Sequence, residues 1–297
     1  MRFTSINRKM TGLWFPLLLV LVLPNKLAWA QVDLAGEWTS RNVNDGQDIG
    51  DYAGIPFNEA GRLRAASWNP DQVDLPENVC RLHPFDIGLR VGPSSLDITK
   101  EVNQSTQAVI AYRIHSYWSG YITIWMDGRP HPSDYTNYKW SGFSTGKWEG
   151  NTLVVTTDHL KEGYFTRAGA IRSAKATVTM AINRYGNYLT AMIIVYDPAY
   201  LSEPYIREAS WLYQPHHIGI PPFTCETPDE GSLIPAGKVP SYMPGKNDAL
   251  SDFAVEYGIP PEAALGGAET VYPEYIKKMK TMKTLPRTTT QHFRRTG

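Results

Sequence analysis

The sequence lacks several patterns that would identify common classes of protein. Beyond residue 30 it has no long hydrophobic run, so no later segment is apolar enough to span a bilayer. It has no alternation of strand and helix patterns, which excludes a Rossmann-like or TIM-like sheet, and no repeat of fixed period, which argues against a solenoid or propeller. The spacings H-x-H and H-E-x-x-H are also missing. We therefore predict neither a metal nor a cofactor.

Cysteine is scarce, because Cys80 and Cys225 are the only two among 297 residues. In an oxidising compartment two cysteines most simply form one disulfide bond. We predict that bond here, with two buried free thiols as the alternative. Neither cysteine has a His or Lys beside it in the sequence, so neither is expected to be a catalytic thiol.

Acidic residues are absent before Asp33, whereas the first nine residues include three basic ones. An apolar stretch over 13–23 follows, and Ala28-Trp29-Ala30 has the small residues of a cleavage site. This pattern predicts a secretory signal peptide at 1–30. The apolar stretch is about half of the ~20 residues that a spanning helix needs, so an uncleaved anchor is the weaker alternative. The expected mature protein is periplasmic or secreted and has no transmembrane segment.

Charge is unevenly distributed along the rest of the chain. Residues 31–276 contain 18 basic and 29 acidic residues, whereas 277–297 contain seven basic and no acidic ones. A protein with an acidic body is a poor partner for nucleic acid. Because termini are commonly frayed and solvated, we predict a disordered basic tail at 284–297. Contact of this tail with anionic lipid or with a partner protein is the alternative.

Period-2 alternation of apolar and polar residues dominates the middle of the chain and predicts β-strands. Gly150-Asn151 and Gly186-Asn187 suit two-residue turns between paired strands. Eight or nine sequential strands must close or stack, because open edges invite aggregation. The fold class is therefore mainly β, an antiparallel up-and-down meander that closes into a barrel, with a β-sandwich as the alternative. The expected strands cover 36–40, 107–115, 121–125, 147–149, 152–157, 176–185, 188–196 and 206–213.

The regions on either side of the strands differ in composition. Residues 31–93 are rich in Gly and Pro, with one helical turn near 59–66. Helical patterns that end at Gly or Pro recur over 247–283. We therefore divide the mature chain into a barrel domain at 31–246, which includes the irregular N-terminal segment, and C-terminal helices at 247–283 that pack on the barrel.

Gly36-Glu37-Trp38 lies near the start of the expected mature chain. It resembles the G-x-W of the first strand of lipocalins, whose Trp closes one end of a β-barrel. The resemblance implies a lipocalin-like barrel for the core of this longer chain. It also implies an Arg packed on Trp38, which the sequence does not assign.

Trp125-Met126-Asp127-Gly128-Arg129-Pro130-His131-Pro132 is the most distinctive stretch of the chain. Together with the segments 146–155 and 266–270 it resembles an uncharacterised family of exported bacterial proteins. That resemblance extends from about residue 34 to residue 275. It implies export and no particular activity.

Aromatic residues concentrate between positions 112 and 140. On a barrel they pack in the core or line a pocket for an apolar or aromatic ligand. Pro130 and Pro132 stiffen the chain around His131, which suits a residue that contacts a ligand. A turn whose Asp127 and Arg129 bond locally is the alternative. The residues that we predict to bind the ligand are His115, Tyr117, Trp118, Trp125, Arg129, His131 and Trp140.

Acid–base catalysis needs a His or a carboxylate within hydrogen-bond reach of a reacting proton. The candidate catalytic residues are His131, His159, Asp158 and Asp127. His115, His131 and His159 would together form a three-histidine metal site if the fold gathered them, but their spacing gives that no support. Gly142-Phe143-Ser144-Thr145-Gly146 matches G-x-S-x-G, yet a hairpin follows Ser144 where a hydrolase requires a helix.

Two functions follow from these observations. The first is an exported soluble β-barrel protein that binds a small apolar or aromatic ligand. The second is a periplasmic enzyme, a lyase, isomerase or hydrolase, that uses His and carboxylate groups. An envelope interaction protein that uses the basic tail is a third possibility.

Overall fold

The computed structural model describes residues 32–41, 49–68, 80, 82–88, 95–164, 166, 169–221, 224 and 241–286. The chain divides into two units, Met1–Ala30 and Gln31–Gly297, and every described residue belongs to the second. The expected signal peptide and residues 287–297 of the expected tail lie outside the described residues. Within the described part of the chain, no helix has both the length and the apolar character needed to cross a membrane.

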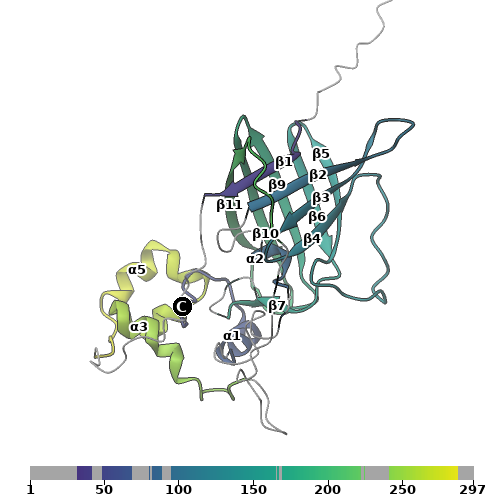
Figure 1. The fold of residues 1–297 in the computed structure, drawn as a ribbon. Coiled ribbons are helices and arrows are strands. Elements are labelled where there is room, and N and C mark those ends of the chain that lie inside the picture. The colour runs from purple at the N-terminus through teal and green to yellow at the C-terminus, as the bar shows by residue number, and fades with distance from the viewer. Residues whose placement is uncertain are drawn as a thin grey trace, which may run out of the picture. The chain divides into compact units, whose positions relative to one another are not determined.

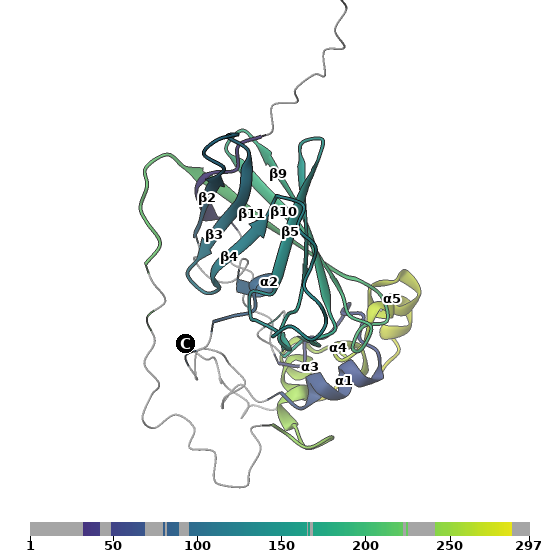
Figure 2. The ribbon, with the colours of Figure 1, turned by 90° about the vertical axis from the view of Figure 1, so that its right-hand side faces the viewer.

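The chain is mainly β, and nine of its strands form a closed barrel (Figures 1 and 2). Each strand pairs with the next along the chain, and β11 pairs with β1 to close the sheet. This confirms the predicted fold class and excludes the β-sandwich. The strands are β1 (Gly36–Ser40), β2 (Ser95–Val102), β3 (Val109–Ser116), β4 (Gly120–Trp125), β5 (Phe143–Glu149), β6 (Thr152–Asp158), β9 (Thr177–Tyr185), β10 (Tyr188–Tyr196) and β11 (Tyr205–Gln214).

The barrel differs from the predicted antiparallel meander at one place, because β4 and β5 run parallel. A closed sheet of nine strands cannot alternate in direction throughout, since an odd number forces at least one parallel pair. A parallel pair needs a connection of about a dozen residues or more. Residues 126–142, which we call the crossover loop, make that connection. The distinctive motif at 125–132 therefore begins this loop.

Side chains fill the barrel interior. Apolar residues at alternate positions of the strands face inward, and most of them are buried. Trp38, Leu96, Ala209 and Trp211 are examples, each no more than 5% exposed. Burial of each large apolar side chain contributes about 1.5–3 kcal/mol to stability. A cavity large enough for a drug-sized ligand would leave the side chains that line it accessible to water. These inward-facing side chains form a packed core.

An aromatic–cation contact joins β1, β9 and β11. The guanidinium of Arg184 on β9 lies 4.9 Å from the ring centroid of Trp38 and 5.3 Å from that of Tyr213. The Nε1 of Trp38 donates a hydrogen bond to the carbonyl oxygen of Leu34 at 3.0 Å. An Arg does lie on Trp38, and the lipocalin resemblance itself stays an expectation.

The remaining elements are short. The segment 49–68 contains α1 and bonds to the C-terminal helices, through Tyr52 N to Ala264 O at 2.9 Å and Gly54 N to Gly267 O at 3.2 Å. It also bonds to the connection between β10 and β11, through Asn58 N to Tyr200 O at 3.0 Å. These elements are α1 (Glu59–Ala66), α2 (Phe85–Gly88), β7 (Gly163–Tyr164), β8 (Ile171–Arg172), η2 (Asp248–Ser251), α3 (Asp252–Tyr257), α4 (Pro261–Ala264), η3 (Ala268–Val271) and α5 (Pro273–Met279).

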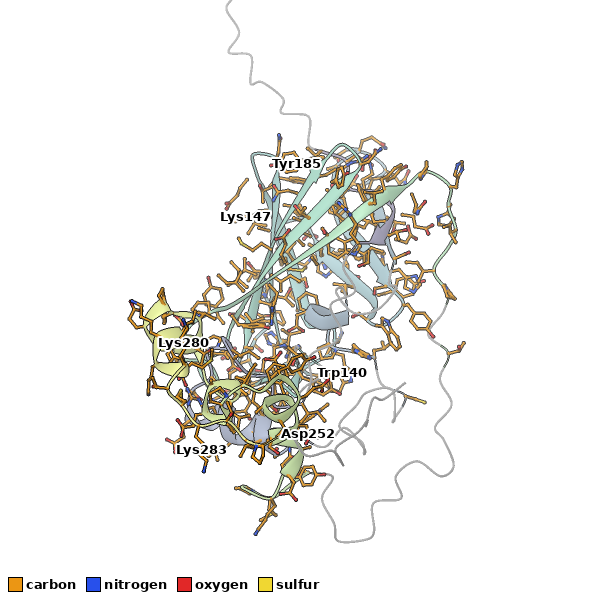
Figure 3. All side chains as sticks on the ribbon, turned by 90° about the vertical axis from the view of Figure 1, so that its left-hand side faces the viewer. Trp140, Lys147, Tyr185, Asp252, Lys280 and Lys283 are labelled. Atoms are coloured by element: carbon orange, nitrogen blue, oxygen red, sulfur yellow. The ribbon has the colours of Figure 1, made fainter. Side chains whose placement is uncertain are left out.

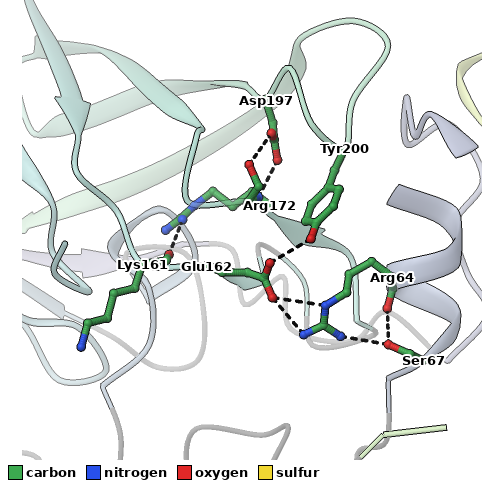
Figure 4. Close-up of polar contacts among 8 residues, drawn as sticks. Arg64, Ser67, Lys161, Glu162, Arg172, Asp197 and Tyr200 are labelled. Atoms are coloured by element: carbon green, nitrogen blue, oxygen red, sulfur yellow. Dashed lines mark hydrogen bonds and ion pairs between the residues drawn. The ribbon is translucent and has the colours of Figure 1, made fainter. Parts of the chain in front are cut away.

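A fully buried ion pair joins α2 to β8. The Nε and Nη2 atoms of Arg172 donate to the two carboxylate oxygens of Asp86 at 2.9 and 3.0 Å, and both side chains are 0% exposed. The Nη1 of Arg172 donates to the carbonyl oxygen of Lys161 at 2.8 Å, a contact drawn in Figure 4. Such two-pronged pairing satisfies a guanidinium that water cannot reach.

The predicted disulfide bond has one end in the described residues. Cys80 is described and Cys225 is not, and the described part of the chain contains no free cysteine. The Cys80–Cys225 bond therefore stays a prediction.

Candidate functional site

The crossover loop and the outer faces of β5 and β6 together form a polar cluster. Strand alternation explains which side chains are available there. Ser144 and Thr157 face the packed interior and are at most 1% exposed, so their neighbours Thr145 and Asp158 face outward. His131 comes from the loop, and His159 follows directly after β6.

His131 contacts both strands. Its Nε2 lies 2.7 Å from the Oγ1 of Thr145, and its Nδ1 lies 2.7 Å from the Oδ2 of Asp158. The second contact has the distance of an ion pair but not the alignment of a hydrogen bond. Contacts of catalytic groups are often poorly aligned before substrate binds. The His131 ring also packs edge-on against Phe143, with ring centroids 5.2 Å apart.

His159 uses both of its ring nitrogens. Its Nδ1 lies 2.7 Å from the Oδ1 of Asp158, and its Nε2 lies 2.9 Å from the carbonyl oxygen of Ser133 in the crossover loop. A carboxylate and a carbonyl accept hydrogen bonds only, so both nitrogens must donate, and an imidazole has two donors only when it is protonated. The contacts therefore identify His159 as an imidazolium cation.

The same argument does not require a charge on His131. The hydroxyl of Thr145 can donate, so Nε2 of His131 can accept while its Nδ1–H faces the Asp158 carboxylate. His131 can therefore make both contacts as a neutral imidazole, whereas His159 cannot. Asp158 thus lies between the charged His159 and His131, which needs only one donor.

His159 also has a backbone constraint. Its φ is 52°, a left-handed conformation that costs a non-glycine residue about 1–3 kcal/mol. Its carbonyl oxygen accepts a hydrogen bond from the backbone N of Lys139 at 2.8 Å, and the backbone N of Lys161 donates to the carbonyl oxygen of Lys139 at 2.9 Å. These bonds fasten the end of the crossover loop to the barrel and hold His159 beside Asp158.

The charge on His159 predicts a pH-dependent stability. Burial lowers the pKa of His159, but hydrogen bonds to Asp158 and to the Ser133 carbonyl outweigh it, so the pKa lies above the ordinary 6.5. A raised pKa contributes stability below the unfolded value, and the contribution is lost as pH rises through the folded value. We expect Asp158→Asn to cost about 1.5–3 kcal/mol at pH values near 6 and clearly less above the folded pKa.

Urea unfolding at the two pH values measures this difference. The control is Glu101→Gln, which breaks the exposed ion pair with Arg113 on the same outer face and should cost little at either pH. An Asp158→Asn cost that does not change with pH would contradict the assignment of His159 as a cation.

Asp127, Arg129 and Trp125 form a second group at the start of the crossover loop. The Nε of Arg129 donates to the Oδ1 of Asp127 at 2.9 Å, and its guanidinium carbon lies 3.4 Å from the ring centroid of Trp125. The hydrogen bond from Arg129 lowers the pKa of Asp127, so this carboxylate is ionised. Asp127 therefore holds Arg129 in place. In the described part of the chain, the contacts of this group do not include His131 or His159.

The other predicted ligand residues lie elsewhere. His115 faces outward on β3 and stacks on Tyr121, with ring centroids 4.3 Å apart. Tyr117 and Trp118 lie in the β3–β4 turn, where Trp118 packs against the Trp68 cluster. Trp140, near the end of the crossover loop, has the Nζ of Lys161 5.5 Å above its ring; it is labelled in Figure 3. Of the predicted set, the structure brings Trp125, Arg129 and His131 into one loop region.

The structure does not gather His115, His131 and His159 into one group. Among the residues that the structure describes, no three His, Cys, Asp or Glu side chains are grouped to hold a metal ion. His115 is stacked on Tyr121, and the Nδ1 atoms of His131 and His159 are both directed to Asp158.

The G-x-S-x-G match points to Ser144, but the hydroxyl at the candidate site belongs to its neighbour Thr145. Ser144 is 1% exposed, and its Oγ lies 2.8 Å from the Oγ1 of Thr157 inside the barrel. Thr145, which no motif singles out, is the hydroxyl beside His131. Because side chains alternate between the two faces of a strand, the inward-facing Ser144 implies that Thr145 faces outward.

A separate network holds Glu162, which lies beyond β6 (Figure 4). Its Oε2 accepts from the hydroxyl of Tyr200 at 2.9 Å, and its Oε1 accepts from the Nη2 of Arg64 at 3.0 Å. This pair connects α1 to the segment between β6 and β7. Because the side chains of Arg64 and Glu162 are each more than a third exposed, we expect it to contribute little to stability.

The comparisons with known proteins do not extend these observations. No family model matches the chain, and neither the curated proteins nor the solved structures include a significant match.

Proposed function

We propose that the chain is an exported enzyme that acts on a small molecule by acid–base chemistry at the outer-face site of His131, Asp158 and His159. The observation that carries this proposal is the Asp158 carboxylate shared by two imidazoles, each with its Nδ1 at 2.7 Å. A neutral histidine held by a carboxylate is the arrangement of a general base. This proposal develops the second of the two functions considered from the sequence.

The packed interior favours the outer face over the barrel interior as the place where a small molecule binds. Inward-facing side chains leave little of their surface accessible, whereas His131 and Asp158 are about a quarter exposed. Phe143 packs against His131 and Tyr138 against His159, and Trp125 is the register partner of Thr145. In the proposal their rings contact an apolar or aromatic part of the substrate.

Each group has a distinct role in the proposed chemistry. Asp158 orients His131 and stabilises the positive charge that forms when Nε2 takes a proton. His159 is already charged, so it neutralises Asp158 electrostatically and fixes the second carboxylate oxygen. It is a positioning residue, and His131 is the group that exchanges a proton with the substrate.

The test is a panel of chromogenic substrates that covers ester hydrolysis, β-elimination and isomerisation, applied to the secreted protein. We expect turnover in one class, and we expect His131→Gln to reduce it by on the order of 10²–10⁴-fold. His217→Gln is the control, since the side chain of His217 is 71% exposed and lies outside the site. Equal activity in the two variants would refute the proposal, as would the absence of turnover in every class.

A further inference from the structure

The hydroxyl of Thr145 is placed for a second chemical role. Its Oγ1 lies 2.7 Å from the Nε2 of His131, whose Nδ1 lies 2.7 Å from the Oδ2 of Asp158. A hydroxyl, an imidazole and a carboxylate in this order, each 2.7 Å from the next, have the order and spacing of a nucleophile, its base and an orienting acid. The imidazole–carboxylate contact has that distance without the alignment of a hydrogen bond. Such triads are recognised by geometry and not by position in the sequence.

The neighbouring hydroxyls do not share this placement. Ser144 and Thr157 contact each other inside the packed barrel. Thr156 lies directly opposite Thr145 across β5 and β6 and is exposed on the same face. Thr145 is the one whose oxygen contacts His131.

We infer that Thr145 is the nucleophile of a Thr145–His131–Asp158 triad and that the substrate is a carboxylic ester. The inference rests on the proposed function, because it uses the same histidine as base. An ester suits the site because its leaving alkoxide needs less assistance than the nitrogen of an amide.

The reaction has two steps. In the first, the Oγ1 of Thr145 bonds to the ester carbonyl carbon while its proton moves to the Nε2 of His131. The carbon–alkoxy bond then breaks, and the leaving oxygen takes that proton as an alcohol. In the second, water attacks the acyl-threonine and gives a proton to His131. The carbon–Oγ1 bond breaks, Oγ1 regains the proton, and the carboxylic acid leaves.

The carbonyl oxygen becomes negative during each attack and needs a positive group nearby. Arg129 supplies one on this face. Its guanidinium packs on Trp125, and Trp125 is the direct register partner of Thr145 across the parallel β4–β5 pair. The Nε and Nη2 atoms of Arg129 donate to the carboxylate of Asp127, which holds the guanidinium there.

The experiment combines a covalent probe with hydrolysis of p-nitrophenyl acetate. Diisopropyl fluorophosphate is incubated with the full secreted protein, and peptide mass spectrometry locates the phosphoryl group. We expect it on Thr145 in the wild type and in Thr145→Ser on the serine. We expect no labelling and at least a ~10²-fold slower hydrolysis in Thr145→Val. Valine has the shape of threonine, so the strand is preserved, and a thermal melt checks the fold.

Thr156→Val is the matched control and should keep both labelling and hydrolysis. Wild-type protein that is unlabelled at Thr145, or Thr145→Val protein that hydrolyses the ester normally, overturns the inference. If His131→Gln is inactive while Thr145→Val is fully active, the result supports the proposed acid–base function and rejects Thr145 as the nucleophile. If both variants are active, both proposals fail.

Discussion

Replacement of Asp86 by alanine is expected to reduce the free energy of unfolding by about 3–5 kcal/mol. The physical reason is the charge that remains. Arg172 is 0% exposed and donates to both oxygens of Asp86, so the variant keeps a buried guanidinium without its carboxylate. In a domain of this size the loss lowers Tm by roughly 10 °C, which a near-UV circular dichroism melt measures.

Two control variants separate charge from volume. Glu269→Ala removes one partner of the ion pair with Arg62, whose side chains are about half exposed, and should cost at most about 1 kcal/mol. The double variant Asp86→Leu/Arg172→Met removes both charges and should be much closer to wild type than Asp86→Ala. If Asp86→Ala costs no more stability than Glu269→Ala, the buried Asp86–Arg172 pair does not stabilise the fold as its burial predicts.

Gly142→Ala is expected to destabilise the barrel by about 2–5 kcal/mol, through left-handed backbone strain together with overpacking. Gly142 has φ 64°, and a Cβ there would lie 2.6 Å from the carbonyl oxygen of Asp158 and 2.7 Å from side-chain atoms of Thr157 and Leu160. A backbone oxygen within β6 cannot move aside cheaply. The accommodation would displace Asp158, so any activity that depends on His131 should fall as well.

Gly128→Ala is the matched comparison in the same crossover loop. Gly128 has φ 73°, but a Cβ there would have nothing within 4 Å, so that variant pays only the backbone strain of about 1–2 kcal/mol. Urea unfolding of the two variants compares them directly. Equal losses would mean that close approach at Gly142 does not limit the structure.

Local signals were sufficient for most of the barrel. The Gly150-Asn151 and Gly186-Asn187 pairs predict the β5–β6 and β9–β10 hairpins, and both are confirmed. Clear alternation is the common property of these strands. β2 was missed, because after Leu96 and Ile98 its sequence continues with charged Lys100 and Glu101, and only pairing with β1 and β3 makes it a strand.

Non-local geometry explains what the sequence could not indicate. The parallel β4–β5 pair follows from closure of an odd number of strands, and no residue in either strand signals it. The candidate catalytic residues His131, Asp158 and His159 are gathered as the acid–base hypothesis requires, but His115 and Asp127 are not among them. The G-x-S-x-G match centres on Ser144, and its outward-facing neighbour Thr145 has no motif of its own.

The filled interior has a kinetic consequence for any molecule that reaches the crossover loop. A ligand that enters a hollow barrel must wait for a portal to open, whereas a group on the outside of a solid barrel meets its ligand at the first productive collision. Association is then limited by diffusion and orientation, not by a conformational step. Under the proposed function, the part of the loop around Gly128, where an added Cβ would meet nothing within 4 Å, can therefore vary in sequence while the packed strands keep their shape.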